Sequence, residues 1–98
     1  MRVIFNIHSN KAAKAAGWRA REVHVNDKNT ADLAEVLKAV RLADGSSMYQ
    51  YIVEEDHISN EWSLYVNGIN VSGSSCPGTE VKDNVQIHLI YNPHAKHQ

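Results

Sequence analysis

The chain has 98 residues, which suits one domain with one core; 43% of the residues are hydrophobic and 21% are charged. The net charge is −1 with histidine neutral, which argues against nucleic acid or a membrane surface as the main partner. A single cysteine excludes an intramolecular disulfide, and no segment is apolar over the length of a signal peptide or a bilayer span, so a cytoplasmic location is expected.

The first quarter of the chain predicts two strands. Apolar and polar residues alternate with a period of two over residues 2–8 and again over 22–25. The segment 9–19 between them is rich in Ala and Lys, and it is interpreted as a short helical turn or a long loop. A polar break at 26–29 then has the composition of a turn.

A helix is predicted directly after this break. Thr30 is expected to cap its N-terminus, because a threonine hydroxyl can accept a bond from an amide of the first turn. Gly45 is expected to end it, since glycine adopts the left-handed conformation readily. The apolar stripe of this helix has the spacing of one helical face and comprises Leu33, Val36, Leu37 and Val40.

The second half of the chain begins with an ambiguous segment and ends in strands. Residues 46–61 are interpreted as a short strand or an irregular lid. The sequence WSLYVNGINV at 62–71 predicts a hairpin, because Asn67 and Gly68 tolerate the positive φ angles of a type I′ turn. Alternation over 81–91 predicts the last strand.

The order of these elements predicts the β-grasp arrangement. We expect a single α+β domain over residues 1–93, with a mixed sheet of four to five strands packed on one main helix. A right-handed crossover would lay the helix on one face of the sheet. Residues 94–98 are expected to form a flexible polar tail.

The chain resembles the sulfur carriers of the ubiquitin-like β-grasp group, which include MoaD, the small subunit of molybdopterin synthase, and ThiS. The resemblance is carried by the hairpin Val66-Asn67-Gly68, by the turn 82–84 (Lys-Asp-Asn) and by the acidic stretch 54–56. It implies a β-grasp fold and a C-terminal Gly-Gly, whose carboxylate an activating enzyme adenylates before sulfur is loaded as a thiocarboxylate.

The end of this sequence departs from that pattern. Two glycines suit a narrow channel because they lack a Cβ, whereas residues 93–98 read PHAKHQ and contain no glycine. We therefore expect a chain that is not a competent sulfur donor. The end of the last strand and the tail are expected to contact a protein partner, and a cofactor-biosynthesis enzyme is one candidate. The residues expected to make this contact are Tyr91, Pro93, His94, Lys96, His97 and Gln98.

The histidines near the C-terminus and the single cysteine could in principle carry chemistry, but neither is interpreted as a chemical site. His94 and His97 are two imidazoles in a tail, and His88 lies on the outer register of the last strand, so a fixed set of three or four zinc ligands is missing. Cys76 is interpreted as a loop thiol, since no neighbouring base can be named from the sequence.

The aromatic and basic residues are likewise interpreted without a binding role. The aromatic side chains Trp18, Trp62, Tyr49 and Tyr51 are expected to fill the core more than to form a partner patch. The basic segment is interpreted as a solvated surface and comprises Lys11, Lys14, Arg19 and Arg21.

The sequence therefore predicts a non-enzymatic protein-binding or accessory module, with no catalytic residue, no cofactor, no metal, no nucleic acid and no membrane partner. Two alternatives stay open. One is a sulfur-carrier role in molybdopterin or thiamine biosynthesis. The other is a homo-oligomer in which residues 48–53 and a sheet edge pair between chains.

Overall fold

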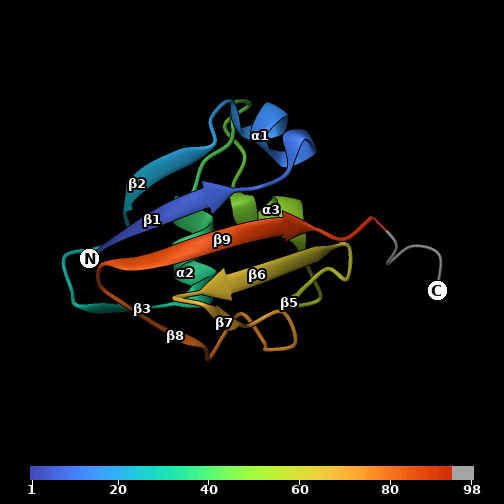
Figure 1. Cartoon of the computed structure of the whole chain (residues 1–98). Helices are drawn as coiled ribbons and strands as arrows, with labels where there is room; N and C mark the ends of the chain where they lie inside the picture. Colours follow the sequence, from blue (N-terminus) through green and yellow to red (C-terminus); the bar gives the residue numbers. More distant parts are fainter. Residues whose placement is uncertain (94–98) are drawn as a thin grey trace.

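The computed structural model describes residues 1–93 (Figure 1). The predicted tail, 94–98, lies outside the described residues. Helices and strands follow one another in the order β1 (Arg2–Ile7), α1 (Asn10–Ala16), β2 (Ala20–His24), β3 (Thr30–Asp32), α2 (Leu33–Ala39), α3 (Met48–Ile52), β4 (Val53–Glu54), β5 (His57–Ile58), β6 (Trp62–Val66), β7 (Ile69–Asn70), β8 (Glu80–Lys82) and β9 (Val85–Tyr91).

A five-stranded sheet with the order β2-β1-β9-β6-β7 forms the framework of the domain. The first and last strands, β1 and β9, are parallel neighbours at its centre, and the other pairs are antiparallel. Two small ribbons, β3–β8 and β4–β5, stand apart from this sheet. The predicted mixed sheet is therefore confirmed, with five strands.

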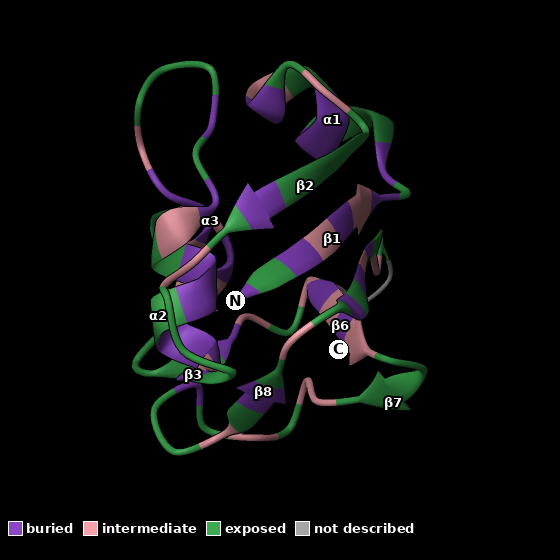
Figure 2. Ribbon diagram, turned by 90° about the vertical axis from the view of Figure 1, so that its left-hand side faces the viewer, coloured by how far each residue is buried: buried purple, intermediate pink, exposed green. Residues whose placement is uncertain are grey.

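The core lies between one face of the sheet and the helices α2 and α3, which cover that face (Figure 1). Figure 2 shows the buried residues of both helices on the side toward the sheet. Burial of each large apolar side chain contributes about 1.5–3 kcal/mol relative to exposure. The side chains with the lowest exposure include Val3 and Phe5 of β1, Ile87 and Leu89 of β9, and the predicted stripe Leu33, Val36, Leu37 and Val40.

The predicted start of the main helix is wrong. Thr30 does not cap it but begins β3, where it pairs with Lys82 of β8. The N-cap position belongs to Asp32, whose carboxylate accepts the Gly78 N–H at 2.6 Å instead of capping its own helix. Pairing with β8, and burial of Ala31 at 7% exposure, outweigh the local preference of threonine for a cap.

The predicted end of this helix is wrong as well. α2 ends at Ala39, and Val40 is already extended with ψ 115° while its side chain stays buried. Gly45, with φ 90°, turns the following loop, and its N–H donates to the Leu42 carbonyl at 3.0 Å. The apolar stripe is therefore longer than the helix, because Val40 reaches the same core from extended backbone.

The ambiguous segment 46–61 contains a helix that was not predicted. Ser47 and Gln50 form a capping box, in which each side chain bonds the backbone N–H of the other, and this box starts α3. The β4–β5 ribbon follows. Met48 and Ile52 are 0% exposed, whereas Tyr49, Tyr51 and Val53 are half-buried, so the apolar stretch 48–53 packs only partly inside the domain.

The short-range turn predictions are confirmed. Asn67 (φ 53°) and Gly68 (φ 85°) connect β6 to β7, as a type I′ turn requires. The segment 9–19 contains the helical turn α1, which ends at Gly17 in the left-handed conformation. Within residues 1–93, no helix has the length and apolar character needed to cross a membrane.

Candidate functional site

Within residues 1–93, no helix covers the face of the sheet opposite α2 and α3 (Figure 1). Successive strand residues point to opposite faces of the sheet. In β1 and β9, Val3, Ile87 and every second residue from them point toward the helices, and the residues between them point to the other face. The outward set is half-buried or exposed and comprises Ile4 and Asn6 of β1, Gln86, His88 and Ile90 of β9, and Ser63 and Tyr65 of β6. This face is the one on which a partner has room to bind.

Two histidines meet on this open face. His8 follows β1, and its N–H donates to the Leu89 carbonyl at 2.9 Å, which keeps it beside β9. The Nε2 atom of His8 lies 2.8 Å from Nδ1 of His88, and the rings stack with their centroids 5.0 Å apart. One nitrogen must donate and the other accept, so this contact requires that at least one of the two facing nitrogens carries no proton.

Apolar side chains surround the histidine pair. A shallow hollow of about 270 Å³ is lined by a set that we call the open-face patch: His8, Tyr65, Gly68, His88 and Ile90. None of these side chains carries a permanent charge, and Ile90 is 38% exposed. An exposed apolar surface of this kind is typical of a contact site.

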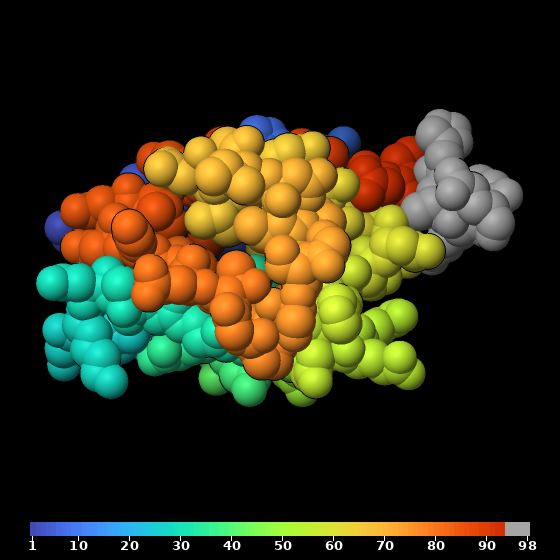
Figure 3. Space-filling model, turned by 90° about the horizontal axis from the view of Figure 1, so that it is seen from below, coloured from blue at the N-terminus to red at the C-terminus, as the bar shows by residue number. Residues whose placement is uncertain are grey.

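Sequence alone does not single out His8. The residues that meet in the open-face patch come from β6, β9, the turn between β6 and β7, and the position directly after β1, and 80 positions separate the two histidines. Ile69, the most exposed large hydrophobic side chain among the described residues at 68%, lies next to this patch in sequence, but it pairs with Val66 and so belongs to the other face. Figure 3 shows how the chain from β6 to β8 (yellow to orange) forms much of the surface seen from below.

The predicted tail contacts begin at Tyr91, the last residue of β9. Its ring centroid lies 5.2 Å from that of Trp62, and Lys11 Nζ lies 5.1 Å above it, so Tyr91 is half-buried. The next residue, Asn92, is held in place because its N–H donates to the Glu61 carbonyl at 2.7 Å. Pro93 is exposed. The other predicted tail residues, His94, Lys96, His97 and Gln98, lie outside the described residues.

Cys76 lies in the loop between β7 and β8, as the sequence indicates, and its side chain reaches into the core. Its side chain is 0% exposed, and its backbone is tied to Asp56 and Ala34 by hydrogen bonds of 2.8 and 3.3 Å. Burial, together with the carboxylates of Asp32 and Asp56, raises the pKa of the Cys76 thiol. A reactive thiolate needs the opposite shift, so this environment does not favour nucleophilic chemistry.

The aromatic residues do not gather into one partner patch. Trp62 is 2% exposed and packs near Tyr51, with ring centroids 5.4 Å apart. Tyr49 lies elsewhere and donates its hydroxyl to Asp56 at 3.0 Å, which raises the pKa of Tyr49. Trp18 is half-buried on the edge of Phe5, with the ring planes at 83°. Within residues 1–93, no three His, Cys, Asp or Glu side chains are placed to hold a metal ion.

Comparison with known proteins gives a match to a solved structure. No protein-family model and no curated protein matches the chain. The crystal structure of SAMP1 from Haloferax volcanii superposes with a TM-score of 0.66, covering 93% of this chain and 94% of that chain at 15% sequence identity. At this identity the likeness concerns the fold. The chain has the α+β β-grasp fold of SAMP1, in agreement with the resemblance to ubiquitin-like proteins that the sequence indicates.

Proposed function

We propose that this protein is a non-enzymatic, ubiquitin-like binding module that docks on a protein partner through its open-face patch and its tail. The open-face patch carries the proposal. It combines Ile90 and Tyr65 with two stacked histidines on a sheet face that no helix covers. Removal of apolar surface from water contributes about 25 cal/mol per Å², so a partner with an apolar surface gains by covering the hollow.

We propose further that the chain is not a competent sulfur donor. The residues that follow β9 in the sequence, from Asn92 to Gln98, all carry side chains. A channel shaped for bare glycine backbone has no space for the side chains of His97 and Gln98, which stand where the carriers have Gly-Gly. The tail then serves as part of the docking surface, next to Tyr91 at the end of a central strand.

A thiocarboxylation assay with the cognate activating enzyme and ATP tests the second proposal. The chain 1–98 should form neither an adenylate nor a thiocarboxylate, whereas the same chain with Gly-Gly in place of His97 and Gln98 should serve as the positive comparison. Intact mass spectrometry measures both products. A thiocarboxylate on Gln98 would favour the alternative role, that of a sulfur carrier in cofactor biosynthesis.

Affinity isolation with matched variants tests the docking proposal. Substitution of Ile90→Asp adds a charge to the open-face patch without removing a buried core group, because Ile90 is 38% exposed. Glu22→Lys changes the charge on the same sheet face but on β2, beyond β1. The bound partner should be lost with Ile90→Asp and retained with Glu22→Lys; equal capture by both variants would contradict docking at this face.

Self-association is a second candidate, and the sheet edge supports it. β2 is an edge strand in which four of five residues are exposed, so its outer backbone groups can pair with another strand. Light scattering at increasing concentration tests it. A mass that stays at 11.0 kDa would exclude this candidate.

A further inference from the structure

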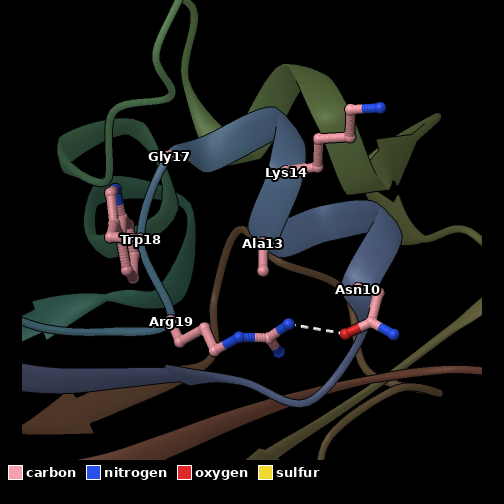
Figure 4. A pocket seen from close by; sticks show the side chains of 6 residues that line it. All are labelled: Asn10, Ala13, Lys14, Gly17, Trp18 and Arg19. Atoms are coloured by element: carbon pink, nitrogen blue, oxygen red, sulfur yellow. Dashed lines mark hydrogen bonds between the residues drawn. The ribbon is translucent and has the colours of Figure 1, made fainter.

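A second surface, away from the open-face patch, has the features of a docking site. A pocket of about 380 Å³ lies between α1 and the chain that returns from it (Figure 4). Gly17 makes this return: with φ 85° it ends α1 and donates its N–H to the Ala13 carbonyl at 2.8 Å. The pocket is lined by Asn10, Ala13, Lys14, Gly17, Trp18 and Arg19.

The lining carries positive charge and no carboxylate. Arg19 donates to the Asn10 side-chain oxygen at 2.5 Å, which holds the guanidinium at the pocket and leaves other N–H donors for a ligand. Lys14 makes no hydrogen bond and no ion pair with the residues that the structure describes. By contrast, Lys11 of the same helix lies 4.0 Å from the carboxylate of Glu61.

The nearest loop does not neutralise this charge. The loop contacts α1 through a hydrogen bond from the Ala43 N–H to the Ala15 carbonyl at 3.2 Å. Its carboxylate, Asp44, accepts the N–H and the hydroxyl of Ser46 at 2.9 and 2.6 Å, and these bonds lower the pKa of Asp44. Within residues 1–93 it forms no ion pair with either pocket cation.

Trp18 forms a fixed wall of the pocket, not a platform for a base. Its edge packs on Phe5, and its Nε1–H donates to the Arg41 carbonyl at 3.4 Å. Arg21 lies over one face of the ring, 5.0 Å from the centroid. The indole is therefore already engaged by the protein, and the donors that remain are long cationic side chains on the rim.

The chemistry of these donors fits carboxylates on a protein chain. Guanidinium and ammonium groups each pair readily with carboxylates, and rim charges of this kind steer a partner of opposite charge. The pocket also lies on the helix whose Lys11 contacts Tyr91, where the tail begins. A partner that covers Tyr91 therefore also meets Lys11 of α1.

We propose that the α1 pocket binds an acidic segment of the partner protein, with one carboxylate at Arg19 inside the pocket and a second carboxylate at Lys14 on the other side of α1 (Figure 4). This inference rests on the proposed function, which supplies the premise that the partner is a protein. It adds the chemistry of that partner: apolar where it covers the open-face patch, and acidic where it meets α1.

An acidic peptide tests the α1 pocket directly, without the natural partner. The probe is a fluorescein-labelled decapeptide of alternating Glu and Ser, and its comparison is the same peptide with Gln for Glu. Binding is measured by fluorescence anisotropy at low salt, and the site by the indole N–H resonance of Trp18 and the amide resonance of Arg19. The Glu peptide should bind and shift both resonances, and binding should weaken as salt rises toward physiological strength.

Charge-reversal variants separate this pocket from general positive charge. Lys14→Glu with Arg19→Glu should weaken binding of the Glu peptide by about tenfold or more. Lys28→Glu with Lys82→Glu makes the same change of charge, just before β3 and in β8, and should have a much smaller effect. Lys14→Arg should retain binding.

Three results would overturn the inference. They are equal binding of the Gln peptide, equal loss in both charge-reversed variants, and displacement of the Glu peptide by inorganic phosphate at equal concentration, which would indicate a small-anion site. The Ile90→Asp variant should bind the peptide normally. Failure of this test therefore leaves docking at the open-face patch standing, and failure of that docking leaves the peptide result intact.

Discussion

Substitution of Cys76 provides a quantitative test of the core environment. The side chain is 0% exposed, and its sulfur forms no hydrogen bond with the described residues. Cys76→Ala removes one heavy atom from this site. Cys76→Ser keeps the size nearly unchanged but exchanges a weakly polar thiol for a hydroxyl that requires a partner.

The two variants are expected to differ in a fixed order. Loss of the sulfur in Cys76→Ala resembles a one-methylene deletion in a core, which costs about 0.5–1.5 kcal/mol. Burial of an unpaired hydroxyl costs about 1–3 kcal/mol, so Cys76→Ser should be the less stable variant. In a domain of this size, 1 kcal/mol corresponds to about 4–8 °C in Tm.

Urea denaturation under reducing conditions, followed by tryptophan fluorescence, measures these free energies of unfolding. The pH dependence adds a second readout. Because the pKa of Cys76 is raised in the folded state, its contribution to stability is fully present below the unfolded pKa near 9.0 and decreases as the pH rises above it. Cys76→Ala should lack this alkaline loss, and comparison with it cancels the titration of the tyrosines.

Two results would refute this reasoning. One is a Cys76→Ser variant at least as stable as Cys76→Ala, because the hydroxyl would then have found a hydrogen-bond partner. The other is rapid reaction of the folded wild-type protein with a thiol reagent, at the rate of an exposed cysteine, because a fully buried thiol reacts only after local opening.

Three further predictions concern turns and caps. Gly68→Ala should lower the free energy of unfolding by about 1 kcal/mol in thermal denaturation, because φ is +85° and no atom within 4 Å would compensate the strain; unchanged stability would contradict this. Ser47→Ala should cost about 1 kcal/mol and speed amide exchange in α3, whereas intact exchange protection would argue against the capping box with Gln50. Asp83 accepts the Arg2 N–H at 2.7 Å, and this bond lowers the pKa of Asp83. The contribution of Asp83 to stability is therefore present above pH 3.8 and is lost in acid. Asp83→Asn should flatten the acid limb of the curve of stability against pH, and an unchanged limb would refute this prediction.

Much of the fold could be predicted because its signals are local. Alternation marks the strands, and Asn67-Gly68 specifies its turn through the φ angles of two adjacent residues. The capping box of α3 is equally local, since Ser47 and Gln50 lie three residues apart, so α3 could have been predicted from the sequence. The features that follow from neighbouring residues are therefore accessible before the structure is known.

The remaining features depend on pairing between distant residues. Thr30 has the local character of a helix cap, but β8, some 50 residues later, pairs with it and keeps it extended. His8 and His88 meet only because β1 and β9 are parallel neighbours in one register. The candidate site is therefore less predictable than the fold, because its members share a surface only after the sheet has formed.

The central position of the parallel pair β1 and β9 has a consequence for biosynthesis. The inward residues of β1, such as Val3 and Phe5, need β9 beside them, yet β9 is translated some 80 residues later. During translation the apolar face of the early strands therefore stays uncovered until β9 has left the ribosome. The central pair of the sheet can therefore form only after residues 85–91 have been synthesised, so this topology makes closure of the sheet a late step in the folding of the domain.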